Sequence, residues 1–165
     1  PEAAPGSVLA AFEPMPTTDH RFPELLQRDH VMLSGRFTQE CKIQYMANVA
    51  AELASLDIRT FMVKAAAGQS FGEQTAQGLA TAKVLVAFCS STYGQKTGVG
   101  YETYEELKHA YEHQQECILL PVKLSPLYPP RPPDTQGKCL CQLAFSPSTV
   151  YIDGLRQDAD GQPHY

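Results

Sequence analysis

Three glutamates gather at the start of one predicted helix, after a loop that follows a buried strand. They are Glu102, Glu105 and Glu106, and the apolar helical rhythm begins at residues 103–107. Two of them are four residues apart, so on one helix their charges would repel and raise the pKa of one. A carboxylate held in a cleft stabilises positive charge that develops on a substrate. This is the chemistry that the pattern indicates first.

Each of these glutamates also has a structural interpretation. Residues 103–106 read as a capping box, in which a threonine and a glutamate three residues later satisfy each other's backbone donors. Glu105 can pair with Lys108 on the solvated face, and Glu102 is expected to precede the helix. The local pattern alone therefore favours a capping role for Glu106.

The strand before these glutamates is the predicted centre of a sheet. Residues 84–89, VLVAFC, form a continuous apolar run of strand length, which is typical of a parallel strand buried on both faces. In an open parallel sheet, ligands bind beyond the carboxyl ends of the strands, where the strand order reverses. Residues 90–106 would lie at that edge.

This stretch resembles the Toll/interleukin-1 receptor (TIR) domain family. In that family the third strand is followed by a serine-x-x-tyrosine loop and by a helix that opens with x-x-Glu-Leu; the matching residues are Ser90–Tyr93 and Tyr104–Leu107. The family's first strand ends in serine, an aromatic or small residue, and arginine, and Ser34-Gly35-Arg36 matches it with glycine where tyrosine is common. The resemblance covers residues 30–153.

A third match lies in the loop after the predicted second strand. Glycine, phenylalanine and an acidic residue recur there in the family, and Gly68, Phe71 and Glu73 fill those places. Many family members carry acidic residues directly after the second strand, whereas residues 63–67 are Val-Lys-Ala-Ala-Ala. Residues 70–73 also read as a capping box, which favours a structural role for the glutamate.

The predicted fold is a flavodoxin-like α/β three-layer sandwich. It has five parallel strands in the order 2-1-3-4-5, with helices on both faces. Thr38 is expected to cap the first helix. The family's final helix is not evident in residues 155–165. Strands are predicted over residues 30–33, 58–63, 84–89, 117–122 and 148–152, and helices over residues 40–56, about 73–81 and from 103.

In the enzymatic branch of the family, the glutamate before the leucine is the catalytic residue of an NAD glycohydrolase. That position is Glu106 here, so the resemblance implies hydrolysis or cyclising transfer at the nicotinamide–ribose bond. NAD would be the substrate, with no metal or cofactor. Arg36 would contact phosphate or ring, and Phe71 and Tyr93 would be stacking groups or cleft walls. The other expected substrate-binding residues are Ser34, Gly35, Ser90 and Glu102.

The alternative is a non-enzymatic signalling module that acts by TIR–TIR self-assembly through residues 68–73. The acid-poor loop and the glycine at position 35 favour it, and the match at Glu106 favours the enzyme. Both interpretations belong to signalling or immune defence.

Composition bounds both interpretations. The 165 residues, 43% hydrophobic and 19% charged, fit one globular domain. The formal net charge of −5 argues against nucleic-acid binding. An odd cysteine count, with Cys41 and Cys89 in predicted core elements, indicates reduced thiols and a cytoplasmic location. No apolar run reaches the roughly 18 residues of a membrane span.

Domain organisation follows from composition along the chain. Residues 1–28 read as a proline-rich linker with at most one short helix, residues 29–155 as the TIR-like domain, and residues 156–165 as a C-terminal tail. The chain begins at Pro1, which we interpret as a piece of a longer protein with other domains.

The sequence lacks the residues that three other kinds of functional site require. A phosphoacceptor receiver needs an aspartate at the end of the central strand, and Phe88-Cys89-Ser90 supplies none. No GxGxxG or P-loop run follows a predicted strand. Cys139-Leu140-Cys141 lacks companion ligands at zinc spacing, so no metal site is predicted.

Overall fold

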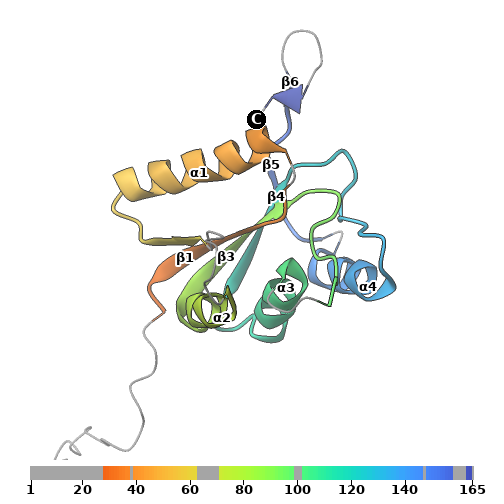
Figure 1. Cartoon of the computed structure of the whole chain (residues 1–165), viewed down its shortest axis with the longest axis horizontal. Coiled ribbons are helices and arrows are strands. Elements are labelled where there is room, and N and C mark those ends of the chain that lie inside the picture. The colour runs from red at the N-terminus through yellow and green to blue at the C-terminus, as the bar shows by residue number, and fades with distance from the viewer. Residues whose placement is uncertain are drawn as a thin grey trace, which may run out of the picture.

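A parallel sheet of five strands, in the order β2-β1-β3-β4-β5, organises the chain. The computed structural model describes residues 28–37, 39–62, 71–98, 102–146, 148–157 and 163–164. Figure 1 shows α1 on one face of the sheet and α2, α3 and α4 on the other. This three-layer arrangement confirms the predicted flavodoxin-like fold and strand order.

The strands are β1 (His30–Gly35), β2 (Thr60–Met62), β3 (Ala82–Cys89), β4 (Ile118–Lys123) and β5 (Ile152–Asp153). The helices are α1 (Glu40–Ser55), α2 (Phe71–Thr81), α3 (Thr103–Glu112) and α4 (Thr135–Ala144). Two further strands, β6 (Arg156–Gln157) and β7 (Pro163–His164), pair antiparallel to each other.

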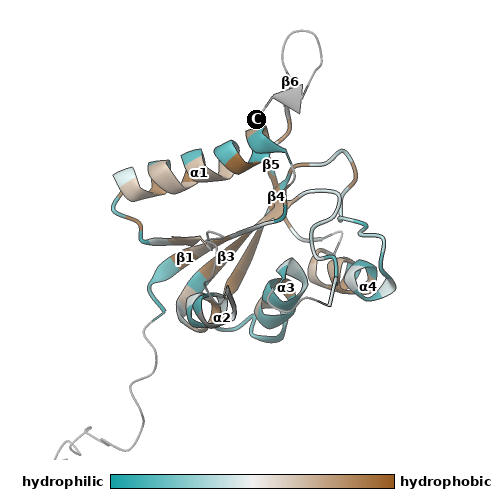
Figure 2. Cartoon of the chain, in the orientation of Figure 1, coloured by the Kyte–Doolittle hydropathy of each residue, from teal (hydrophilic) through white to brown (hydrophobic). Residues whose placement is uncertain are grey.

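Strand β3 is the centre of the sheet, as predicted. Leu85 lies opposite Met32 of β1 on one side and opposite Leu119 of β4 on the other. Every residue of β3 from Leu85 to Cys89 is buried. Strands β1, β3 and β4 stand out as hydrophobic in Figure 2. A strand covered on both faces needs apolar side chains in both directions, which explains the continuous apolar run.

The core has two sides. On the α1 side, Leu33 and Phe88 pack with Met46. On the other side, Met32 and Leu85 pack with α2 and α3. Because side chains alternate along a strand, consecutive residues of β1 belong to opposite sides. Ser34 therefore lies on the same side as Met32, toward α3.

Several predicted elements need correction. The second strand covers only residues 60–62, and the fifth lies at residues 152–153 instead of 148–152. The N-cap of α1 is Gln39, which makes no side-chain capping bond, and Thr38, the expected cap, lies outside the described residues. Cys41 is exposed and not a core thiol, although Cys89 is buried.

Helix α4 was not predicted at all. Its N-cap is Asp134, whose carboxylate accepts a hydrogen bond of 2.6 Å from the backbone N–H of Gly137. Leu140, Cys141 and Ala144 are buried at helical spacing. Dense prolines directly precede Asp134, so this capping aspartate is the signal in the sequence that could have predicted the helix.

Other predictions fall largely outside the described residues. Apart from Arg28, the predicted linker is outside them, as are residues 63–70 of the second loop and the side chains of Phe71 and Glu73. No helix in the described part is long and apolar enough to span a membrane.

Candidate functional site

Three predicted site residues form one buried hydrogen-bonded cluster. The hydroxyl of Ser34 donates to Oε2 of Glu106, and the hydroxyl of Tyr93 lies 2.8 Å from Ser34 Oγ. Glu106 is 6% exposed, Ser34 is 2% exposed and Tyr93 is fully buried. The cluster joins residues from β1, from the turn after β3 and from the first turn of α3.

Local structure explains why these side chains meet. Ser34 is next to last in β1 and faces α3. The N–H of Tyr93 donates to the carbonyl of Ser90 at 3.2 Å, which closes a tight turn and directs the ring under the sheet edge. There the ring packs against Phe145, with centroids 6.1 Å apart. Leu107, beside Glu106, is fully buried in the same cluster and anchors the start of α3.

The buried carboxyl of Glu106 has an unusual acidity. Burial raises the pKa of Glu106 from its ordinary 4.5 to about 7, and the hydrogen bond from Ser34 partly opposes that rise. The expected repulsion between Glu102 and Glu106 is not the cause. The raised pKa instead comes from the loss of water around the carboxyl group.

Glu102 differs from Glu106 in its environment and in its structural role. It is the N-cap of α3, as expected from its place before the helix. Its carboxylate accepts hydrogen bonds from the backbone N–H groups of Thr97, at 2.6 Å, and Gly98, at 3.3 Å, and also from the Thr97 hydroxyl. Burial would raise the pKa of Glu102, but these bonds and the charge of Arg36 outweigh it and lower that pKa. Glu102 thus holds the loop before α3.

The capping-box interpretation of residues 103–106 is wrong. The hydroxyl of Thr103 accepts a hydrogen bond of 3.1 Å from the backbone N–H of Gly94, and Glu106 bonds to Ser34 instead of its own helix. Neither side chain is used as a cap, so the structural explanation that local sequence favoured does not account for Glu106.

A cleft of about 350 Å³ lies at the carboxyl edge of β1 and β3, where the chain leaves the two strands toward opposite faces. This is the topological switch point, where open α/β sheets bind ligands. The hydroxyl of Ser90 donates to the carbonyl of Arg36 at 3.0 Å and ties the two loops together. The lining residues are Arg36, Phe37, Gln39, Lys42, Ser90, Ser91, Thr92 and Gln95.

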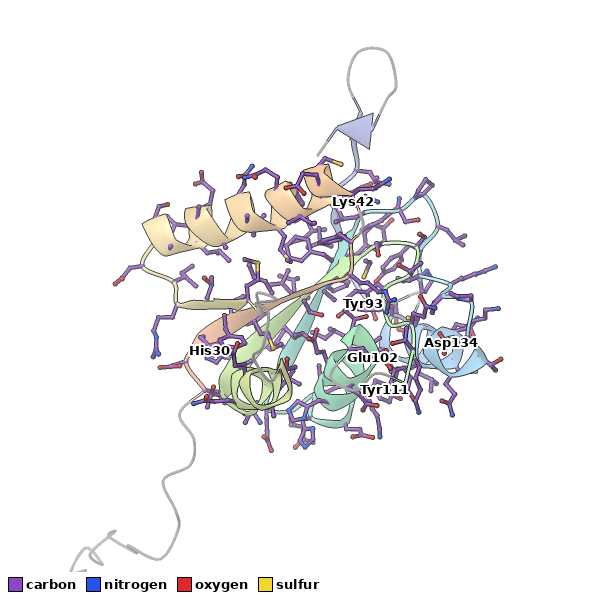
Figure 3. The ribbon with its side chains drawn as sticks, in the orientation of Figure 1. His30, Lys42, Tyr93, Glu102, Tyr111 and Asp134 are labelled. Atoms are coloured by element: carbon purple, nitrogen blue, oxygen red, sulfur yellow. The ribbon has the colours of Figure 1, made fainter. Side chains whose placement is uncertain are left out.

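Two basic residues line this cleft at the start of α1, Arg36 and Lys42. Figure 3 shows Lys42 on the α1 side of the sheet and Tyr93 on the opposite side. A cation near a helix N-terminus is disfavoured by the helix dipole, so basic residues held there favour an anionic ligand. Lys42 is therefore a candidate anion ligand that sequence reasoning missed.

Gly35 makes room for the aromatic wall of the cleft. A Cβ at this position would lie 2.6 Å from the ring of Phe37, so the absence of a side chain lets that ring lie over the end of β1. Phe37 also meets Phe88 edge-on, with centroids 6.3 Å apart. Gly35 stands where tyrosine is common in the family, and the aromatic ring at this end of β1 comes from Phe37, two positions later.

The predicted site residues fall into two groups. Arg36 and Ser90 line the cleft, whereas Ser34, Tyr93 and Glu106 are buried and are not among its lining residues. Tyr93 is buried, so it does not form a cleft wall in this structure. Cys139 is exposed and Cys141 buried, and the described residues contain no group of three that could hold a metal ion.

The fold and the switch-point cleft define a flavodoxin-like α/β domain with a site at the sheet edge. The TIR domain family profile matches residues 37–162, and the chain belongs to this family. No curated protein matches it. The TIR domains in the structure of the activated Roq1 resistosome, which directly recognises the pathogen effector XopQ, are similar at 25% identity with a TM-score of 0.44. That match covers 57% of this chain and 56% of the other.

Proposed function

We propose that this domain is a TIR-type NAD glycohydrolase or cyclase in which Glu106 is the catalytic residue. The observation that carries the proposal is a buried glutamate, with its pKa raised to about 7, which is bonded to Ser34, two residues before Arg36 of the switch-point cleft. Membership of the TIR family supports it, because the matching glutamate is catalytic in the enzymatic branch.

The chemistry needs only one carboxylate. When the bond between ribose C1′ and the nicotinamide nitrogen breaks, the bonding electron pair leaves with nicotinamide, which departs as a neutral molecule. The ribosyl centre becomes cationic, and an ionised Glu106 stabilises it in a site of low dielectric constant. Water then adds to C1′ and loses a proton, or a nucleophile within the same molecule closes the ring. No general acid is required for the leaving group.

The cleft supports an anionic substrate. Arg36 and Lys42 supply positive charge for the diphosphate of NAD, and Phe37 supplies an aromatic surface. A volume of about 350 Å³ is within the range of small-molecule sites, which is roughly 300–1,000 Å³. Ser34, Gly35, Ser90, Glu102 and Phe71 remain proposed contacts of the substrate or of its loops.

Glu106 is covered in the present conformation. With 6% exposure it faces Ser34 and Tyr93, and turnover requires a conformation in which its carboxylate reaches the ribose. This observation favours a second candidate function, a signalling module that acts by TIR–TIR self-assembly without catalysis. The two candidates differ in one measurable property, which is release of nicotinamide.

The deciding experiment is incubation of the purified chain at high concentration with NAD, with nicotinamide release followed by chromatography. Release by the wild type and its loss in Glu106→Gln support the enzyme. Absence of release, together with concentration-dependent assembly, supports the signalling module.

We also propose a cytoplasmic role in signalling or immune defence. Three of the five cysteines are buried free thiols, Cys89, Cys117 and Cys141. Buried unpaired thiols are typical of proteins in a reducing compartment.

A further inference from the structure

The hydroxyl of Tyr93 has one described partner, the hydroxyl of Ser34, which in turn bonds to Glu106. We infer that Tyr93 is a positioning residue for Glu106 and that it acts through Ser34 by a directed chain of hydrogen bonds. This inference rests on the proposed function in one respect only, that Glu106 is the catalytic carboxylate. The chain itself is testable without turnover.

The direction of the chain follows from the number of protons. A serine hydroxyl has a single hydrogen, so when Ser34 donates to ionised Glu106, its oxygen must accept from Tyr93. Tyr93 then donates, Ser34 relays and Glu106 accepts. When Glu106 is protonated, its own O–H can donate to Ser34, and Ser34 can donate to Tyr93. The protonation state of Glu106 is thereby linked to the orientation of the Tyr93 hydroxyl.

Among the described residues, no neighbouring charged group replaces the hydroxyl chain in stabilising ionised Glu106. Cys89 of β3 and Cys141 of α4 would act electrostatically on Tyr93 if they were ionised. Burial raises the pKa of each thiol, that of Cys141 to about 12, so both are neutral at physiological pH. Glu102, one turn earlier on α3, is bonded to Thr97 and Gly98. Glu106 accepts a hydrogen bond from Ser34, and this bond lowers its pKa. The chain of hydroxyl groups is therefore the contact that stabilises its ionised form.

The fold provides a matched control for the tyrosine. Tyr128 packs against the same Phe145, with centroids 6.0 Å apart, compared with 6.1 Å for Tyr93. The hydroxyl of Tyr128 is buried without a partner, whereas the hydroxyl of Tyr93 bonds to Ser34. Replacing either tyrosine by phenylalanine keeps the ring, but only Tyr93→Phe removes a link of the chain.

The experiment is an NMR titration of the full 165-residue chain carrying ¹³C in the glutamate carboxyl groups and in Cζ of tyrosine. The Glu106 signal is identified by its absence in Glu106→Gln. We expect Tyr93→Phe to raise the Glu106 midpoint by about 0.4 to 1 pH unit, the value of one hydrogen bond. Tyr128→Phe should leave that midpoint unchanged.

A double-mutant cycle tests whether Tyr93 acts through Ser34. Ser34→Ala should raise the midpoint, and adding Tyr93→Phe to Ser34→Ala should raise it no further. Equal shifts from Tyr93→Phe in both backgrounds, or no shift in either, would overturn the inference.

A measurement on the wild type does not depend on the folding of any variant. The Cζ signal of Tyr93 should change with the same midpoint as Glu106, and that of Tyr128 should not follow it. A Tyr93 signal that is constant through the Glu106 titration overturns the inference. If the linked titrations appear but no NAD is cleaved, the hydrogen-bond chain stands and the catalytic proposal fails.

Discussion

Ser34, at the end of β1, donates a hydrogen bond to Glu106 in the first turn of α3, 72 residues further along the chain. The bond lies beneath the sheet edge, where both side chains are buried. Among the described residues, it is the hydrogen bond that satisfies a buried carboxyl group. An ion buried without a partner would cost several kcal/mol. The bond therefore connects the sheet to the helix that carries the proposed catalytic residue.

The first prediction separates catalysis from structure at Glu106. Glu106→Gln keeps the shape and can still accept from Ser34, but it removes the charge that would stabilise a ribosyl cation. We expect NAD cleavage to slow by roughly 30- to 1,000-fold, equivalent to about 2 to 4 kcal/mol. Nicotinamide release measured by chromatography, with a melting curve for each protein, is the assay.

Glu105→Gln is the matched control for that change. Glu105 carries the same charge one residue away and lines a separate groove with Thr75 and Lys108, between α2 and α3. Its replacement should leave the rate unchanged. Equal rates in the wild type and both variants would refute the catalytic assignment.

The second prediction concerns stability and pH. The folded-state pKa of Glu106, about 7, lies above its ordinary 4.5. Its stabilising contribution is therefore fully present below about pH 4.5 and is lost as the pH rises through about 7. The loss is at most about 3 kcal/mol.

Glu106→Gln isolates this contribution from the other titrating groups. We expect the free energy of unfolding of the wild type, relative to Glu106→Gln, to fall between about pH 4.5 and pH 7, the interval between the ordinary and the folded-state pKa of Glu106. Denaturant melts at several pH values measure it. Parallel pH profiles for the two proteins would show that Glu106 has no raised pKa.

The third prediction tests the cleft as an anion site. Arg36→Ala and Lys42→Ala should each raise the KM for NAD by about tenfold or more, because each removes a charged contact to the diphosphate. Lys108→Ala is the control, since Lys108 is exposed on α3 beside Glu112 and lies outside the cleft. KM values that change equally in all three variants would point to general electrostatics and not to this site.

The fourth prediction concerns the turn that positions Tyr93. Gly94 has a φ of +74°, and a Cβ there would lie 2.7 Å from Sγ of Cys141. Gly98 has a φ of +80°, but a Cβ there meets nothing within 4 Å. Alanine at either position incurs the left-handed backbone cost of about 1–2 kcal/mol, and only Gly94→Ala adds a clash.

We therefore expect Gly94→Ala to lower the free energy of unfolding more than Gly98→Ala, by about 1–3 kcal/mol. Denaturant unfolding of the two variants measures the difference. Equal losses would mean that the contact with Cys141 relaxes without cost.

The fifth prediction addresses self-assembly. The segment predicted to be an assembly loop, residues 68–73, includes Gly68 and Phe71, and α2 begins at Phe71. If a neighbouring copy receives this loop, Phe71→Ala should weaken self-association while the domain stays folded, with little change in its melting temperature. Sedimentation velocity over a concentration series tests this, and unchanged sedimentation would count against assembly through the loop.

The sequence by itself determined the frame of this protein. The continuous apolar run from Val84 to Cys89 predicts a strand covered on both faces, because only such a strand buries every side chain. Alternating strand and helix patterns then predict the parallel sheet of a flavodoxin-like fold, whose usual strand order is 2-1-3-4-5. The matches at Ser34–Arg36 and Tyr104–Leu107 identified the family and pointed to Glu106. These are local signals of periodicity and motif, and they can be read without knowing what packs against what.

Only the tertiary structure decided what surrounds Glu106. Local pattern favoured a capping box and a repulsion between Glu102 and Glu106. In the structure Glu106 bonds to Ser34, 72 residues away along the chain, and Ser34 bonds in turn to Tyr93. Lys42 is a candidate anion ligand because the position of α1 places it in the lining of the cleft. Long-range hydrogen bonds and the loss of water around a carboxyl group depend on which elements pack together. The spacing of neighbouring residues therefore cannot predict either of them.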